Sequence, residues 1–201
     1  MENRIFNEVN DELVSMVKRG EVIAFPTETV YGLGVIPSLE NKNKLIQIKH
    51  RPENKPFTLM CSNVEQIKKL GIVDEIAQKI ISHFMPGEIT ILIKAKPSIP
   101  GFLHNDTGVL GFRIPNKKEI LDLINRVDSP LLVPSANRSG EPPLTSFESV
   151  FNEFKGDVYA FLKGNCDSTL PSTIIDLTEK DVKIIREGKI KKEEIYEFVR
   201  S

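Results

Sequence analysis

The sequence predicts an α/β protein with α+β character: one domain, residues 1–201, in which helices cover the faces of a twisted mixed β-sheet. Short apolar segments typical of buried strands alternate irregularly with amphipathic segments of helical period, and this order favours a mixed sheet over a purely parallel one. No internal repeat, low-complexity tract or long linker divides the 201 residues, a length that suits one domain.

Helices are predicted where apolar residues recur at helical spacing between caps or breakers. Asn63 with Gln66, and Asn116 with Glu119, resemble capping boxes that would begin two of these helices. The predicted helices are residues 8–19, 39–49, 63–70, 74–85, 116–127, 147–154 and 191–200.

Strands are predicted at short apolar runs, namely residues 22–25, 57–61, 89–93, 109–114, 131–133, 158–162, 174–177 and 182–186. Pro26 cannot donate to a sheet ladder, so the first strand should stop there. A polar segment, residues 26–34, then follows as a loop, and its two glycines allow a tight turn or close approach to a ligand. This segment fits either a binding site at a strand end or a plain connection with Tyr31 folded onto the core.

Composition limits the classes of function. The net charge is −1, from 27 Lys and Arg against 28 Asp and Glu, so any nucleotide or nucleic acid contact must use local patches. Two cysteines, Cys61 and Cys166, are too few for a disulfide framework and are expected to be reduced. Residues 1–10 lack an apolar signal core, and no apolar run approaches the roughly 20 residues of a membrane helix. We therefore expect a soluble cytoplasmic protein without membrane contact.

Three cations, Lys49, Arg51 and Lys55, lie within seven residues of a proline-flanked segment. Lys49 and Arg51 are two apart in what we expect to be a non-helical segment, so they should point to the same side. Such a pair can hold a polyphosphate, with a planar fork from arginine and a point charge from lysine. A solvated surface charge run is the alternative.

Polar residues also mark the ends of other predicted strands. Arg113 should face away from its apolar neighbours, and if that face is covered, the guanidinium needs either a ligand carboxylate or an internal ion pair. Ser135 and Asn137 can face one ligand with a hydroxyl and a carboxamide, or simply close a turn. Common nucleotide loops are missing, and the three histidines lie apart, so no metal site made by protein side chains is expected.

Taken together and in order, these segments resemble the TsaC/YrdC family of threonylcarbamoyl-AMP synthases, in the short form without an extra C-terminal domain. The motifs that carry the resemblance are PTETVYGLG at 26–34, KHRP at 49–52, KP at 55–56, PG at 86–87, GFRIP at 111–115, SANRSG at 135–140, ST at 172–173 and REG at 186–188. Glu88 departs from the family, which often has a second proline at that place.

The resemblance implies a YrdC-like fold with a large open cavity and a nucleotidyltransferase reaction. L-Threonine, bicarbonate and ATP with Mg²⁺ would give L-threonylcarbamoyladenylate and pyrophosphate, without a tightly bound cofactor. The product would supply the N6-threonylcarbamoyladenosine modification of tRNA through downstream tRNA threonylcarbamoyl transferase proteins. Two alternatives stay open: an RNA-binding module without catalysis, and a relative that uses another carbamoylated substrate. Weak RNA binding is also compatible with the synthase.

The resemblance also implies roles for individual residues, although it assigns neither an acid–base group nor a nucleophile. Residues expected to bind ATP are Lys49, Arg51, Lys55, Ser135, Asn137 and Arg186. Residues expected to bind L-threonine are Thr29, Arg113 and Ser172, with Arg113 on the carboxylate. Further candidates that would line the pocket are Thr27, Tyr31 and Thr173.

Overall fold

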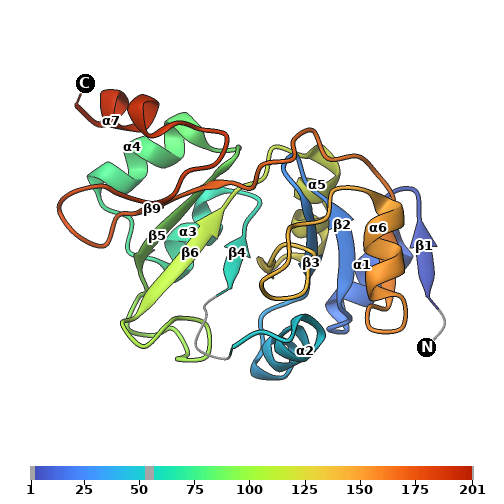
Figure 1. Ribbon diagram of the computed structural model, residues 1–201. Helices are drawn as coiled ribbons and strands as arrows, with labels where there is room; N and C mark the ends of the chain where they lie inside the picture. Colours follow the sequence, from blue (N-terminus) through green and yellow to red (C-terminus); the bar gives the residue numbers. More distant parts are fainter. Residues whose placement is uncertain (1–2, 53–56, 201) are drawn as a thin grey trace.

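The fold is an α/β arrangement of two mixed sheets and their covering helices (Figure 1). The computed structural model describes residues 3–52 and 57–200. The four-stranded sheet has the order β1 (Arg4–Phe6), β8 (Ala160–Leu162), β2 (Ile23–Pro26) and β3 (Tyr31–Gly34). The six-stranded sheet has the order β10 (Lys183–Arg186), β9 (Thr173–Asp176), β5 (Ile89–Lys94), β6 (Val109–Arg113), β4 (Thr58–Met60) and β7 (Leu131–Leu132).

Both sheets combine parallel and antiparallel pairs. In the four-stranded sheet β8 is parallel to β1 and β2, whereas β2 and β3 form an antiparallel hairpin. In the six-stranded sheet β5 is parallel to β9 and β4 to β6, and the other pairs are antiparallel. The predicted mixed α/β class is confirmed, with the strands divided between two sheets.

The two sheets meet where β3 runs alongside β7 and the segment after it. Isolated bridges pair Gly32 with Ser135 and Val35 with Leu132, and the Leu33 amide donates to the Pro134 carbonyl at 2.9 Å. Because these hydrogen bonds join one sheet edge to the other, the segments before β3 and after β7 are held side by side.

Helices lie around both sheets. The structure has α1 (Asp11–Lys18), α2 (Leu39–Lys49), α3 (Val64–Leu70), α4 (Glu75–Phe84), α5 (Lys118–Val127), α6 (Phe147–Phe154) and α7 (Lys192–Arg200). In Figure 1, α3, α4 and α7 accompany the six-stranded sheet, whereas α1 and α6 accompany the four-stranded one. Among the helices that the structure describes, none has the length and apolar character needed to cross a membrane.

Capping residues account for most helix starts. Asn63 caps α3 as predicted, because its side chain accepts from the Gln66 amide at 3.0 Å. The predicted capping box at Asn116 is wrong: α5 has Lys117 at its cap position, without a side-chain cap hydrogen bond. The Asn116 amide instead donates to Glu28 Oε1 at 2.9 Å, so a distant carboxylate binds this turn.

The strand β1 was not predicted from the sequence.

Residues 26–34, predicted as a loop, form a tight turn followed by β3. The two glycines of β3 allow neighbouring side chains to pack closely against the strand. A Cβ atom on Gly34 would lie 2.3 Å from Phe25 Cε1, and one on Gly32 would lie 2.6 Å from Val133 Cγ1. Only glycine therefore allows these neighbours to pack against the strand.

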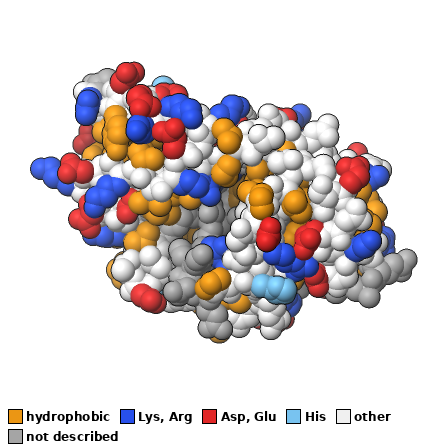
Figure 2. Space-filling view, in the orientation of Figure 1, with side chains coloured by type: hydrophobic (Ala, Val, Ile, Leu, Met, Phe, Trp, Pro, Cys, Tyr) orange, Lys and Arg blue, Asp and Glu red, His pale blue; other side chains and the backbone are white. Residues whose placement is uncertain are grey.

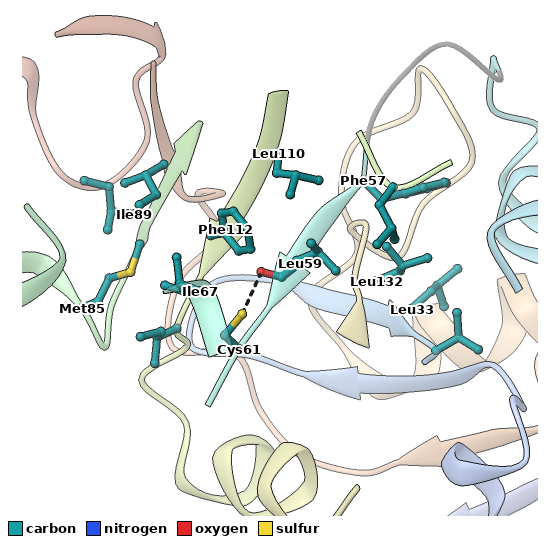
Figure 3. Close-up of a cluster of buried hydrophobic side chains, with 14 of the residues drawn as sticks. Leu33, Phe57, Leu59, Cys61, Ile67, Met85, Ile89, Leu110, Phe112 and Leu132 are labelled. Atoms are coloured by element: carbon teal, nitrogen blue, oxygen red, sulfur yellow. Dashed lines mark hydrogen bonds between the residues drawn. The ribbon is translucent and has the colours of Figure 1, made fainter. Parts of the chain in front are cut away.

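The larger of two apolar clusters extends across both sheets. Figure 3 shows Leu33 of β3 near Leu132, and Leu59 and Phe112 on the neighbouring strands β4 and β6. Cys61 lies in the same cluster, where burial raises the pKa of its thiol. The smaller cluster is formed mainly by α1, α5 and the four-stranded sheet. Because one closely packed core joins the two sheets, the residues that border the space between them are held in fixed positions.

Candidate functional site

A cavity of about 310 Å³ lies between the two sheets. Its walls come from the turn 27–32, from strands β4, β5 and β6, and from segments 133–135, 171–174 and 185–186. Figure 2 shows the surface hollowed between the two halves of the molecule, with Lys and Arg side chains at the edge of the hollow. This volume is at the lower end of the range for small-molecule sites.

Most of the predicted site residues converge on this cavity. Those that line it are Thr27, Thr29, Tyr31, Arg51, Arg113, Ser135, Ser172 and Arg186. Lys49, Asn137 and Thr173 are not among its lining residues, and Lys55 lies outside the described residues. Segments up to 159 residues apart in the chain thus meet at one place, since the set runs from Thr27 to Arg186.

Three guanidinium groups give the cavity its charge. Arg51 follows α2, and its guanidinium carbon lies 4.9 Å from the centre of the Phe57 ring. Burial lowers the pKa of Arg51. Burial and then the nearby charge of Arg113 lower the pKa of Arg186. Among the described lining residues there is no carboxylate, and guanidinium groups can bind an anionic ligand.

Arg113 forms a buried ion pair with Glu28. The Nη2–Oε1 distance is 2.8 Å, and the two side chains are 7% and 5% exposed. Arg113 Nε also donates to the Gly87 carbonyl at 3.2 Å. The internal ion pair that the sequence left open is therefore present, and the same guanidinium also lines the cavity.

Hydroxyl groups occupy two further walls. Thr27 Oγ1 donates to the Val30 carbonyl at 2.7 Å and lies 2.9 Å from Thr29 Oγ1, so the turn presents both hydroxyls together. Across the cavity, Ser172 Oγ lies 2.9 Å from Thr90 Oγ1. These groups can orient the polar end of a small ligand.

Lys49 is placed differently from the prediction. It is the last residue of α2, 1% exposed, and its ammonium donates to the carbonyls of Ser135 and Asn137, each at 2.5 Å. The predicted helix over residues 39–49 is confirmed at Lys49, so the second expectation, that Lys49 shares a non-helical segment with Arg51, is wrong. The backbone of the loop after β7 binds the ammonium. Burial, followed by the charges of Arg51 and Arg138, lowers the pKa of Lys49 to about 7.

Two other predicted residues support loops. Asn137 accepts from Ser135 Oγ at 2.6 Å and donates to the carbonyls of Arg138 and Glu141, which closes the loop after β7. Thr173 Oγ1 donates to the Ile190 carbonyl at 2.6 Å and accepts from the Gly188 amide, which anchors the turn after β10. Each shapes a segment that carries a cavity residue.

Tyr31 belongs to the core and is also one of the residues that line the cavity. Its side chain is fully buried, and its hydroxyl donates to the Gly164 carbonyl at 2.8 Å. Burial raises its pKa to about 12. The core position that the sequence allowed for Tyr31 is the one observed.

Sequence reasoning missed two residues of the site. Thr90 lies between two buried isoleucines of β5, and a threonine at that position of an alternating strand is a usable signal for a polar wall. Glu28 belongs to the 26–34 motif, but nothing in its neighbours indicates that it pairs with a residue 85 positions later.

Within the described residues, no three His, Cys, Asp or Glu side chains are grouped as metal ligands.

Comparisons with known proteins show which family the chain is similar to. The family described as Sua5_yciO_yrdC, telomere recombination, matches residues 15–188. The threonylcarbamoyl-AMP synthase of Pyrococcus abyssi is 33% identical over 186 residues, which cover 91% of this chain and 55% of that protein. The threonylcarbamoyl-AMP synthase of Enterobacter sp. (strain 638) is 32% identical over 170 residues, covering 82% of this chain and 89% of that protein.

The fold matches as well. The crystal structure of P. abyssi Sua5 complexed with L-threonine has a TM-score of 0.90 and 29% identity, covering 98% of this chain and 61% of that one. The chain thus spans a little over half the length of its Pyrococcus relative. The family match over most of the sequence and these similarities show that the chain belongs to the Sua5/YciO/YrdC family.

Proposed function

We propose that this chain is a nucleotidyltransferase that forms L-threonylcarbamoyladenylate and pyrophosphate from L-threonine, bicarbonate and ATP with Mg²⁺. The observation that carries the proposal is the meeting of three guanidinium groups with the hydroxyls of Thr29 and Ser172 around one cavity. Two relatives with the name threonylcarbamoyl-AMP synthase support it. The product would serve N6-threonylcarbamoyladenosine formation in cytoplasmic tRNA, through downstream tRNA threonylcarbamoyl transferase proteins.

L-Threonine is assigned to the Arg113 end of the cavity. The guanidinium would bind its carboxylate, since a charge-assisted pair in a buried site is strong and directional. Thr29 and Ser172 would accept from or donate to the remaining polar groups of the amino acid. The L-threonine complex of P. abyssi Sua5 supports an amino-acid ligand in this fold.

ATP is assigned to Arg51, Ser135 and Arg186, and Lys55, which belongs to the same expected set, lies outside the described residues. Arginine forks suit phosphate oxygens. Mg²⁺ would arrive with the triphosphate as part of the substrate, because the described walls offer hydroxyls and cations in place of carboxylates. Lys49 and Asn137, which belong to the ATP set, would act by holding the loop that presents Ser135.

The chemistry requires alignment more than covalent catalysis. The uncharged amine of threonine attacks bicarbonate carbon, and loss of water leaves a carbamate. A carbamate oxygen then attacks the α-phosphorus, the bond between this phosphorus and the bridging oxygen breaks, and pyrophosphate leaves. Cations that neutralise the developing charge and walls that align both substrates supply the rate enhancement.

The decisive assay is pyrophosphate release that requires ATP, L-threonine and bicarbonate together, with mass detection of the adenylate. Omitting any one substrate should abolish release. A silent assay with tight, salt-sensitive RNA binding would favour the RNA-binding alternative instead. Release with another amino acid or with carbamoyl phosphate in place of threonine and bicarbonate would favour the relative with a different carbamoylated substrate.

A further inference from the structure

Thr90 carries a buried hydroxyl that strand packing alone does not require. It lies on β5 between Ile89 and Ile91, which belong to the larger apolar cluster, and it lines the cavity together with Leu92. The residue is only 2% exposed. A valine has nearly the same shape and suits a buried strand, whereas a buried hydroxyl is costly unless it is hydrogen-bonded. The hydroxyl therefore calls for an explanation in the cavity.

The Thr90 hydroxyl is hydrogen-bonded to the hydroxyl of Ser172. The two oxygens lie 2.9 Å apart, and either can be the donor. This contact is not needed to join the two segments, because β5 and β9 already form a parallel ladder. The Thr173 amide also donates to the Glu88 carbonyl at 2.9 Å. The contact between Thr90 and Ser172 thus orders hydroxyl groups, while the backbone holds the strands together.

The backbone of Ser172 is fixed by Arg186 and by its own chain neighbours. Arg186 Nε and Nη2 donate to the Ser172 carbonyl at 3.2 Å and 2.7 Å, and Nη2 lies 3.4 Å from Ser172 Oγ. Gly188 packs so closely here that a Cβ atom on it would lie 2.1 Å from the Pro171 carbonyl oxygen. Ser172 can still rotate its hydroxyl hydrogen, and the direction of that hydrogen depends on Thr90.

The two hydroxyls have one hydrogen to spare. A guanidinium has only N–H donors, so Ser172 Oγ acts as the acceptor in its long contact with Arg186. Thr90 and Ser172 carry two hydroxyl hydrogens between them, and their mutual hydrogen bond uses one. Within the described residues, the second hydrogen is not donated to any protein acceptor. Because both residues line the cavity, a ligand beside them is offered a donor.

An oxyanion is the ligand group that suits this donor. Arg113 and Arg186 also line the cavity, and the charge of Arg113 is near enough to contribute to the lowered pKa of Arg186. Positive charge beside a hydroxyl donor favours a negatively charged acceptor. When an oxyanion accepts from Ser172, Thr90 can donate to Ser172 Oγ in turn. Hydrogen bonds in such a chain polarise and strengthen one another.

We propose that Thr90 is a positioning residue: its hydroxyl donates to Ser172 Oγ and thereby directs the Ser172 hydrogen to an oxyanion of the amino-acid substrate. This oxyanion is the carboxylate that Arg113 binds or the carbamate formed on the amino-acid nitrogen. Ser172 belongs to the L-threonine set and touches Arg186 of the ATP set, so it lies where the two substrates would meet. The inference rests on the proposed function, since it assumes that an amino acid binds beside Ser172.

The test compares the wild type with Thr90→Val, which keeps the shape and removes the hydroxyl, and with Thr90→Ser, which keeps the hydroxyl. Calorimetry gives the Kd of L-threonine alone and of a non-hydrolysable ATP analogue alone, and an assay with all substrates saturating gives the rate of adenylate formation. We expect Thr90→Val to weaken threonine binding or to slow the rate about tenfold, and Thr90→Ser to restore most of the loss. Weaker threonine binding identifies the carboxylate as the acceptor. A slower rate at unchanged Kd identifies the carbamate.

Ser172→Ala provides the background that separates positioning from packing. In this background Thr90→Val should cause no further loss, because the group that Thr90 positions is absent. Additive losses would show a merely structural role and would overturn the inference. Thr178→Val is the matched control, since Thr178 Oγ1 donates to Asp176 Oδ1 at 2.7 Å and Thr178 does not line the cavity. This control should leave the threonine Kd and the rate unchanged.

Three further outcomes would also overturn the inference: equal values for the wild type and Thr90→Val, a loss in Thr90→Ser as large as in Thr90→Val, or a change confined to the Kd of the ATP analogue. If Thr90→Val does not fold, Thr90→Ala and Thr90→Ser allow the same comparison, because these two variants differ by the hydroxyl alone. A wild type that neither binds threonine nor forms the adenylate would instead reject the proposed function, so the two failures are distinguishable.

Discussion

Arg113 shows how a single side chain can take part both in a buried ion pair and in the cavity wall. Its guanidinium pairs with Glu28 on one side and borders the ligand space on the other. Arg51 and Arg186 border the same space. At the residue scale, the proposed function therefore depends on whether the guanidinium of Arg113 binds the carboxylate of the amino acid.

Arg113→Ala is expected to raise the KM for threonine far more than the KM for ATP. A lost charge-assisted pair to the substrate carboxylate is worth on the order of 2–4 kcal/mol. Steady-state pyrophosphate release, measured well below the melting temperature of the variant, gives both constants. Arg4→Ala, which removes an exposed pair with Glu12, is the control. An equal rise in the two KM values would contradict the assignment of Arg113 to the threonine carboxylate.

Lys49 should make stability depend on pH. Its pKa is about 7 in the folded chain, below the ordinary value of 10.5, so between these pH values the unfolded chain binds a proton that the folded chain has released. The free energy of unfolding should therefore rise with pH from 7 to 10.5, by up to about 1.4 kcal/mol per pH unit, and this gain is lost as pH falls through 7.

Lys49→Met is the variant that isolates this effect. Urea denaturation of the wild type and the variant at pH 7.0, 7.75 and 8.5 should give a difference in unfolding free energy that grows with pH. Burial raises the pKa of Cys166 to about 11, which acts in the opposite direction at higher pH but cancels in the comparison. Parallel pH profiles would show that the ammonium stays protonated beside its two carbonyl acceptors.

At the scale of elements, one arginine joins α2, α6 and the loop after β7. Arg138 Nη1 donates to the Ile48 carbonyl, and its other nitrogens pair with Glu153 at 2.6 Å and Asp157 at 2.7 Å. The guanidinium carbon also lies 4.7 Å from the centre of the Phe154 ring. The helix that ends at Lys49 is thereby docked on the loop that carries Ser135.

Arg138→Ala should destabilise the protein by about 2–4 kcal/mol, because several charge-assisted hydrogen bonds and a ring contact are lost together. Arg4→Ala serves again as the control, since an isolated exposed pair contributes about 1 kcal/mol or less. Urea denaturation measures both. Equal losses in the two variants would mean that the Arg138 interactions do not act as a network.

Elements were predictable from the sequence where local chemistry decides them. Helices such as α3 and α4 have both a capping side chain and an apolar stripe, and their predicted bounds agree with the observed ones to within one residue. β3 was missed because its two glycines suggest a turn, and only their packing against Phe25 of β2 and Val133 shows why the strand requires them. β1 is three residues long and mostly exposed, so it has no apolar pattern.

The site was predictable in composition but less so in arrangement. Eight of the residues that the sequence proposed line one cavity. Lys49 and Glu28 show the limit, because a lysine bound to loop carbonyls and a glutamate paired with a strand 85 residues later are consequences of tertiary packing. No local pattern contains that information.

At the scale of the whole molecule, both sheets contribute walls to the cavity, so ligands should stabilise them together. L-Threonine with a non-hydrolysable ATP analogue, each at about 100 times its Kd, should add roughly 2.7 kcal/mol per independent ligand. Hydrogen exchange should slow in segments 27–32 and 171–174, which belong to different sheets. Segment 78–83 of α4, which does not line the cavity, is the internal reference. Slower exchange in one sheet alone would contradict a shared site.

The parallel pairing of β1 and β2 with β8 has a consequence for biosynthesis. Arg4 and Ile23 both pair with Ala160, so the nascent chain must reach that residue before the four-stranded sheet can close. Contacts of such large sequence separation slow folding, and unpaired strand edges invite association while they wait. During synthesis, β1 and one edge of β2 therefore have no strand partner until β8 has emerged, although β2 can already pair with β3.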